Sequence, residues 1–138
     1  MSSTEMTPNA NAMLTKPIIT ELTVEELKQL QTSMGQQHLL IIKFSAVWCG
    51  PCKKIAPLFH DFINNAAPNI IFAEIDVDES IDLYISLKKQ KMVSGIPAIF
   101  AYYGSNKQRE KWFIPDDSVI GADETAVRAF FERCRNKK

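Results

Sequence analysis

Two cysteines separated by two residues are the part of this sequence best suited to covalent chemistry. The motif Cys49-Gly50-Pro51-Cys52 follows the apolar run 39–45 almost directly. A Cys-x-x-Cys pair that opens a helix places its first sulfur near unpaired backbone N–H groups and the positive end of the helix dipole, which favour thiolate over thiol. Because the thiolate is the form that attacks a disulfide, this placement predicts a reactive dithiol.

Three other interpretations of the cysteine pair fit less well. Zinc needs four ligands, but Cys49 and Cys52 supply only two, and the histidines His38 and His60 form no spaced second pair. A structural disulfide between such close residues closes too small a loop to stabilise the fold much. Two inert cysteines would leave the intervening residues unexplained, whereas a reactive site uses the glycine for access and the proline for the first helical turn.

The elements that must position this pair alternate between strand and helix patterns. The run 39–45 is apolar almost throughout, which indicates a strand covered on both faces, as in the middle of a parallel sheet. Thr23 and Glu26 have the spacing of a capping box, and Asp78 and Asp123 are expected to cap later helices. The cysteines therefore lie at the carboxyl end of a parallel strand, where open α/β sheets carry their sites.

We expect helices at 23–35, 52–65 and 78–90, and a last one running from residue 123 through Val127, Phe130, Phe131 and Cys134. Strands are expected at 17–22, 39–45, 69–76, 98–103 and 109–114, the last two joined as a hairpin through 104–106. The sequence thus predicts an α/β fold in which a mixed sheet of about five strands has an antiparallel edge and is flanked by four helices.

Composition narrows the partners and the compartment. The 138 residues suit one domain, expected at 17–138 after a disordered tail at 1–16. The 16 basic and 16 acidic residues balance, and no basic stretch is interleaved with aromatics, so no nucleic-acid partner is expected. No stretch approaches the roughly twenty apolar residues of a membrane span. Three cysteines are too few for a disulfide scaffold, which favours a reducing compartment, and we expect a cytoplasmic protein. We also expect it to be a monomer.

Three segments resemble the thioredoxin family. Residues 44–53, Phe-Ser-Ala-Val-Trp-Cys-Gly-Pro-Cys-Lys, resemble the family's active-site segment, and Gly95-Ile96-Pro97 resembles its cis-proline loop. Ile120-Gly121-Ala122 is similar to the loop before the family's last helix. The resemblance runs from about residue 18 to residue 134 and implies a thioredoxin-like fold.

The resemblance also implies a mechanism. Cys49 would attack a substrate disulfide, and Cys52 would then attack Cys49 and release the reduced substrate. Protein disulfides are the implied substrates, a separate thioredoxin-reductase-like donor restores the dithiol, and no cofactor is needed. The implied contact surface for an extended substrate segment comprises Trp48, Gly50, Pro51, Ile96, Pro97 and Gly121. The Gly-Pro dipeptide between the two cysteines resembles that of family members that act as reductants. The alternatives to a reductant are an oxidant or isomerase, or a binding module that uses this fold.

Lys43 departs from the family pattern. Thioredoxins usually hold a buried aspartate six residues before the first cysteine, and Lys43 occupies that position here. Glu74 stands where many members have a lysine, so the two charges are inverted. Because an unpaired buried ammonium is costly, we expect Lys43 and Glu74 to be neighbours. Glu74 would take the proton from Cys52 while Lys43 favours the thiolates; a swap that only preserves charge neutrality is the alternative.

Two segments and one cysteine remain outside this scheme. Segments 80–94 and 107–117 are longer than is usual in the family, and they either tune partner choice or are tolerated surface insertions. Cys134 is expected to be packed beside Phe130 and Phe131 rather than reactive.

Overall fold

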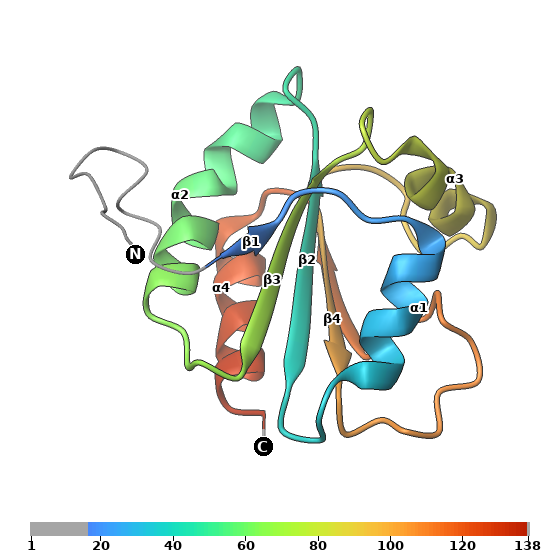
Figure 1. The fold of residues 1–138 in the computed structure, drawn as a ribbon. Helices are drawn as coiled ribbons and strands as arrows, with labels where there is room; N and C mark the ends of the chain where they lie inside the picture. Colours follow the sequence, from blue (N-terminus) through green and yellow to red (C-terminus); the bar gives the residue numbers. More distant parts are fainter. Residues whose placement is uncertain (1–16, 138) are drawn as a thin grey trace, which may run out of the picture.

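A mixed sheet forms the centre of residues 17–137, the part of the chain that this computed structural model describes (Figure 1). Its strands are β1 (Ile18–Ile19), β2 (Leu39–Ser45), β3 (Ile70–Asp76), β4 (Ala98–Tyr103) and β5 (Asp117–Ile120). They lie in the order β1-β3-β2-β4-β5, with β1, β3 and β2 parallel, β4 antiparallel to β2 and β5 antiparallel to β4. The predicted mixed sheet with an antiparallel edge is confirmed. The tail predicted at 1–16 lies outside the described residues.

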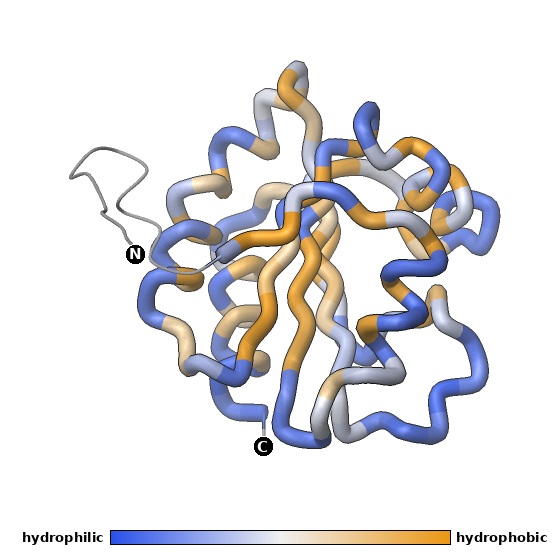
Figure 2. Tube along the Cα trace, viewed as in Figure 1, coloured by the Kyte–Doolittle hydropathy of each residue, from blue (hydrophilic) through white to orange (hydrophobic). Residues whose placement is uncertain are grey.

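Helices cover both faces of the sheet. They are α1 (Val24–Ser33), α2 (Gly50–Asn64), α3 (Ile81–Lys89) and α4 (Glu124–Arg135). Figure 1 shows α2 and α4 on one face and α1 and α3 on the other. Apolar residues concentrate along the strands, as Figure 2 shows, and two buried clusters fill the two layers. Central strand β2 is buried at six of its seven residues, which explains its continuous apolar sequence.

Two of the predicted caps are present. The Thr23 hydroxyl accepts a hydrogen bond from the Glu26 amide, while the Glu26 carboxylate accepts one from the Thr23 amide, so the capping box is formed. Asp123 caps α4 by accepting from the Thr125 amide at 3.0 Å. Both helices thus start where the sequence predicted.

The prediction that Asp78 caps the third helix is wrong. Helix α3 begins at Ile81, with Ser80 as its N-cap residue. The Ser80 hydroxyl makes no capping bond because it accepts from the Leu22 amide at 3.2 Å, which ties the segment before α1 to the start of α3. The Asp78 carboxylate instead accepts from the Trp48 indole N–H at 2.8 Å.

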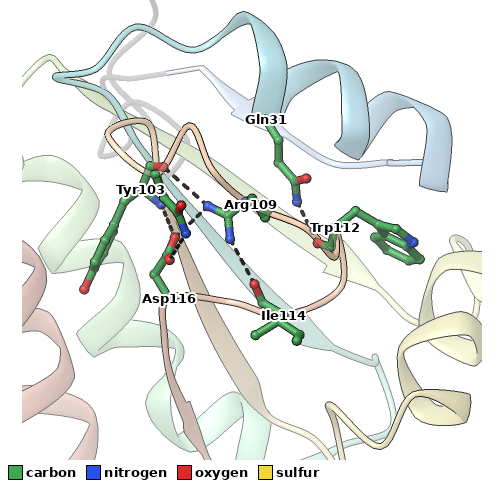
Figure 3. Close-up of polar contacts among 7 residues, drawn as sticks. Gln31, Tyr103, Arg109, Trp112, Ile114 and Asp116 are labelled. Carbon is green, nitrogen blue, oxygen red and sulfur yellow. Dashed lines mark hydrogen bonds and ion pairs between the residues drawn. The ribbon is translucent and has the colours of Figure 1, made fainter.

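The strand predicted at 109–114, and the hairpin through 104–106, are also wrong. Residues 104–116 form a long loop, and the edge strand β5 begins only at Asp117. Arg109 holds this loop together (Figure 3): its guanidinium donates to the Ile114 carbonyl at 3.0 Å and to the Asp116 carboxylate at 2.6 Å. The Asp116 carboxylate also accepts from the Tyr103 amide at 2.7 Å. An extended strand would place Arg109 too far from these groups.

The same loop is tied to the rest of the fold. The Gln31 side-chain amide on α1 donates to the Trp112 carbonyl at 2.8 Å (Figure 3). Trp112 and Phe113 are both partly buried against the core on the α1 and α3 face. Neither ring is therefore the freely exposed aromatic that an alternating strand would have presented.

None of the helices described between residues 17 and 137 is long and apolar enough to cross a membrane.

Candidate active site

The cysteine pair lies at the junction of β2 and α2. Helix α2 begins at Gly50 rather than near Cys52, so Cys49 is its N-cap residue, and the Cys49 sulfur accepts a hydrogen bond from the Cys52 amide at 3.1 Å. The two cysteines form a disulfide, with their Cα atoms 5.3 Å apart, within the usual range for such a bond. Pro51 lies in the first helical turn, where its missing N–H removes no bond. The helix terminus can therefore stabilise a thiolate at Cys49 once the disulfide is reduced.

A second loop faces the first cysteine. The Ile96–Pro97 peptide bond is cis, and the Ile96 carbonyl oxygen lies 3.9 Å from the Cys49 sulfur. The Gly121 amide donates to the Pro97 carbonyl at 2.8 Å, which fixes the loop before α4 beside the proline loop. Gly121 has a φ of 103°, a conformation in which a side chain would be strained.

Most of the predicted contact residues share one groove. A groove of about 690 Å³ is lined by Gly50, Pro51, Lys54, Ile96, Pro97, Gly121, Ala122 and Asp123. Trp48 does not line this groove; its side chain is 66 % exposed and its indole is held by Asp78. The sequence assigns Asp78 to a helix cap and therefore does not predict its bond to Trp48.

Lys43 and Glu74 are neighbours, as the sequence predicted. They are register partners on the parallel strands β2 and β3, and the Lys43 ammonium lies 3.2 Å from a Glu74 carboxylate oxygen. The Lys43 side chain is 2 % exposed, whereas that of Glu74 is 27 % exposed. The Lys43 ammonium also lies 5.4 Å from the centre of the Phe59 ring on α2. The buried cation thus has a carboxylate and an aromatic face as partners.

The charged pair and the second cysteine line a common pocket. This pocket of about 350 Å³ opens between β2, β3 and α2, and its lining includes Cys52, Lys43, Glu74, Asp76 and Ala56. Cys52 and the ion pair therefore border the same open space, although Cys52 itself is only 2 % exposed. Lys43 stands where the resemblance leads us to expect an aspartate. It lines the same pocket as Cys52, but its charge is opposite to that of an aspartate.

His60 is a residue of this cluster that the sequence analysis did not assign. Its Nε2 lies 3.0 Å from the second carboxylate oxygen of Glu74. The signal was available, because Lys53, Ala56 and His60 have the i, i+3, i+7 spacing of one helix face, and the first two line the pocket. From the sequence, His60 is weighed only as a zinc ligand. Among the residues between 17 and 137, no three acidic, histidine or cysteine side chains gather to hold a metal ion.

Cys134 is separate from this site and packed, as predicted. It lies 2 % exposed on α4 within the core shared with α2. Burial, with a smaller contribution from the Asp117 charge, raises the pKa of the Cys134 thiol to about 12. A thiol that stays protonated at neutral pH is a poor nucleophile.

We expect iodoacetamide to alkylate the reduced protein at Cys49 but not at Cys134 near pH 8. Unfolding in urea should restore alkylation of Cys134, because its thiol then regains an ordinary pKa. The pKa of the Cys134 thiol is higher in the folded than in the unfolded state. The contribution of this protonated thiol to the free energy of unfolding is therefore full below about pH 9 and is lost as the pH rises toward 12. Peptide mass spectrometry measures the labelling, and equal labelling of Cys134 in folded and unfolded protein would contradict the prediction.

Comparison with known proteins agrees with this geometry. The profile of the thioredoxin family matches residues 19–118. The thioredoxin of Coprinus comatus is 28 % identical over 111 residues, which cover 80 % of this chain and 93 % of that protein. The structure of Fasciola hepatica thioredoxin superposes with a TM-score of 0.62 at 26 % identity, covering 83 % of this chain and 98 % of that one. Oxidised mitochondrial thioredoxin 3 of Saccharomyces cerevisiae gives 0.59 at 29 % identity, with coverages of 83 % and 94 %.

Proposed function

The chain belongs to the thioredoxin family, and from this premise we propose that it reduces protein disulfides, with Cys49 as the attacking sulfur and Cys52 as the resolving one. Its activity is thiol-disulfide exchange through the Cys49–Cys52 pair. The observation that carries the assignment of roles is the position of Cys49 as N-cap of α2, where its sulfur accepts from the Cys52 amide.

The exchange conserves electrons and protons. The Cys49 thiolate forms a bond to one sulfur of the substrate disulfide, whose S–S bond breaks, and the released substrate sulfur takes up a proton. Cys52 then loses its proton and attacks the Cys49 sulfur, which frees the second substrate sulfur as a thiol. Two electrons pass from the dithiol to the substrate, and the chain ends as the Cys49–Cys52 disulfide.

Glu74 is the proposed acceptor of the Cys52 proton. Both residues line the same pocket, which opens to solvent, so water in this pocket would carry the proton from the thiol to the carboxylate. Lys43, ion-paired to Glu74, is proposed to favour the thiolate forms through its positive charge. This arrangement gives the inverted charges a role in exchange.

An extended peptide is the proposed substrate segment. The groove beside the dithiol is shallow and largely apolar, and the Ile96 carbonyl at its edge lies near the Cys49 sulfur. Trp48, exposed next to Val47 and the dithiol in the chain, would contact residues of the substrate beyond the groove. Backbone bonding at Ile96 would then supply affinity with little sequence preference.

A dithiol donor of the thioredoxin-reductase kind is the proposed source of electrons, and the cytoplasm the proposed compartment. Family membership implies disulfide substrates and a reductase in general terms. The low cysteine count and the buried Cys134 support a reducing compartment. Fractionation of cells that produce the tagged protein tests the compartment, and recovery from an organelle lumen would contradict it.

The reduction potential of the Cys49–Cys52 pair tests the direction of electron flow. Equilibration with glutathione buffers should give a value close to that typical of thioredoxin, about −270 mV, because the Gly-Pro dipeptide is retained. A value near the roughly −120 mV of a strong dithiol oxidant would overturn the proposed role as a reductant.

A further inference from the structure

Glu74 is held at both of its carboxylate oxygens. One oxygen lies 3.2 Å from the Lys43 ammonium, and the other lies 3.0 Å from Nε2 of His60. The two partners differ in their access to water: the Lys43 side chain is 2 % exposed, whereas that of His60 is 36 % exposed. Of the two partners of Glu74, His60 is therefore the one in contact with bulk solvent, and the Glu74 side chain itself is 27 % exposed.

The two partners also differ in how they respond to pH. Histidine is the side chain whose charge ordinarily changes between pH 5 and 8, whereas carboxylates and ammonium groups ordinarily titrate outside that range. Besides Lys43 and Glu74, three charged residues line the pocket between β2, β3 and α2. They are Lys53 on α2, Asp76 at the end of β3 and Glu79 before α3. None of these is a histidine, and His60 is the histidine that contacts Glu74.

We propose that His60 is a positioning residue for Glu74 and that its protonation makes exchange at Cys52 depend on pH. With a neutral imidazole, Glu74 faces one cation and can accept the Cys52 proton. With an imidazolium, Glu74 faces two cations, which favour its charged form and oppose proton uptake. Resolution by Cys52 therefore slows as pH falls and His60 becomes charged. This inference rests on the proposed role of Glu74 as proton acceptor.

The first experiment compares His60→Gln with wild type in single-turnover reduction of insulin between pH 5.5 and 8.5. Glutamine keeps a donor for Glu74 but does not titrate. We expect His60→Gln to be about fivefold faster than wild type near pH 6, because one nearby positive charge is absent, and equal to it near pH 8. Superimposable profiles over the whole range would overturn the inference.

His38→Gln is the matched control. His38 is the other histidine of the chain, and it lies before β2, where its Nδ1 accepts from the Gly35 amide at 2.9 Å. Its removal should leave the pH profile parallel to wild type. An equal change in both variants would mean that His60 has no special role.

A third comparison separates failure of this inference from failure of the proton-acceptor role. Lys43→Met/Glu74→Gln is compared with Lys43→Met, so that the buried ammonium is never left without its carboxylate. If Glu74→Gln leaves the rate in this background unchanged, Glu74 does not accept the proton, and both ideas fail. If it lowers the rate while His60→Gln matches wild type, only the His60 inference fails.

A measurement on wild type keeps the test independent of how the variants fold. NMR of the imidazole C–H signals gives the pH range over which His60 becomes charged in the native protein. The rate of resolution by Cys52 in wild type should fall over the same pH range. A rate that stays flat through the His60 transition would contradict the proposal.

Discussion

Replacing Cys52 by serine should stop the reaction halfway. Reduced Cys52→Ser protein mixed with an excess of a peptide disulfide is expected to release one thiol and keep the other half of the peptide on Cys49, because no second sulfur can displace it. Wild type should release two thiols and carry no peptide. Turnover is expected to fall by on the order of 10³-fold or more.

Intact-protein mass spectrometry and thiol titration read out both halves of this prediction. Cys49→Ser is the matched control: it should release no thiol and carry no peptide, since the helix-capping position then holds a hydroxyl of low nucleophilicity. A Cys52→Ser protein that releases two thiols would show that another group resolves the mixed disulfide.

The second large effect concerns stability. Glu74→Ala leaves the Lys43 ammonium buried without its carboxylate, and loss of one partner from a buried pair costs about 3–5 kcal/mol. Adding Lys43→Met to this variant should restore much of the loss, because methionine is close to lysine in length and carries no charge. Lys43→Met alone should cost less than Glu74→Ala, since Glu74 keeps His60 and contact with water.

Urea denaturation of the four proteins in this cycle gives the coupling between the two residues. The free energies of unfolding should be strongly non-additive, as expected for groups in direct contact. Losses that simply add would show that the ion pair contributes nothing specific to the folded state, and would also weaken the case for Lys43 as a charge that acts on the thiols.

The parts of the fold that the sequence predicted well are those set by local pattern or by full burial. Strand β2 was predicted with its observed bounds because both of its faces are covered, and α1 was predicted because Thr23 and Glu26 satisfy each other three residues apart. The pairing of Lys43 with Glu74 followed from the cost of an unpaired buried cation. In each case the deciding interaction was visible as spacing or as charge balance.

The errors have a common physical cause. The strand expected at 109–114 was overridden by the Arg109 side chain, whose bonds to Asp116 and to the Ile114 and Tyr103 carbonyls define a loop. His60 was missed because its partner Glu74 is fourteen residues away on another element. Such contacts follow from packing: helical spacing places His60 on the helix face of Lys53 and Ala56, but it does not identify Glu74 as the partner.

The two ends of the sheet are physically separate, and this has a practical consequence. The dithiol lies beyond the carboxyl end of β2, and the loop 104–116 lies beyond the opposite end of the sheet (Figure 1). Gln108, Glu110 and Lys111 in that loop are exposed, while Arg109 and Asp116 lock its base. A linker or fluorophore attached at these exposed positions would leave the reactive sulfurs facing away from the point of attachment. The loop is therefore a suitable site for attaching the protein to an electrode in a defined orientation.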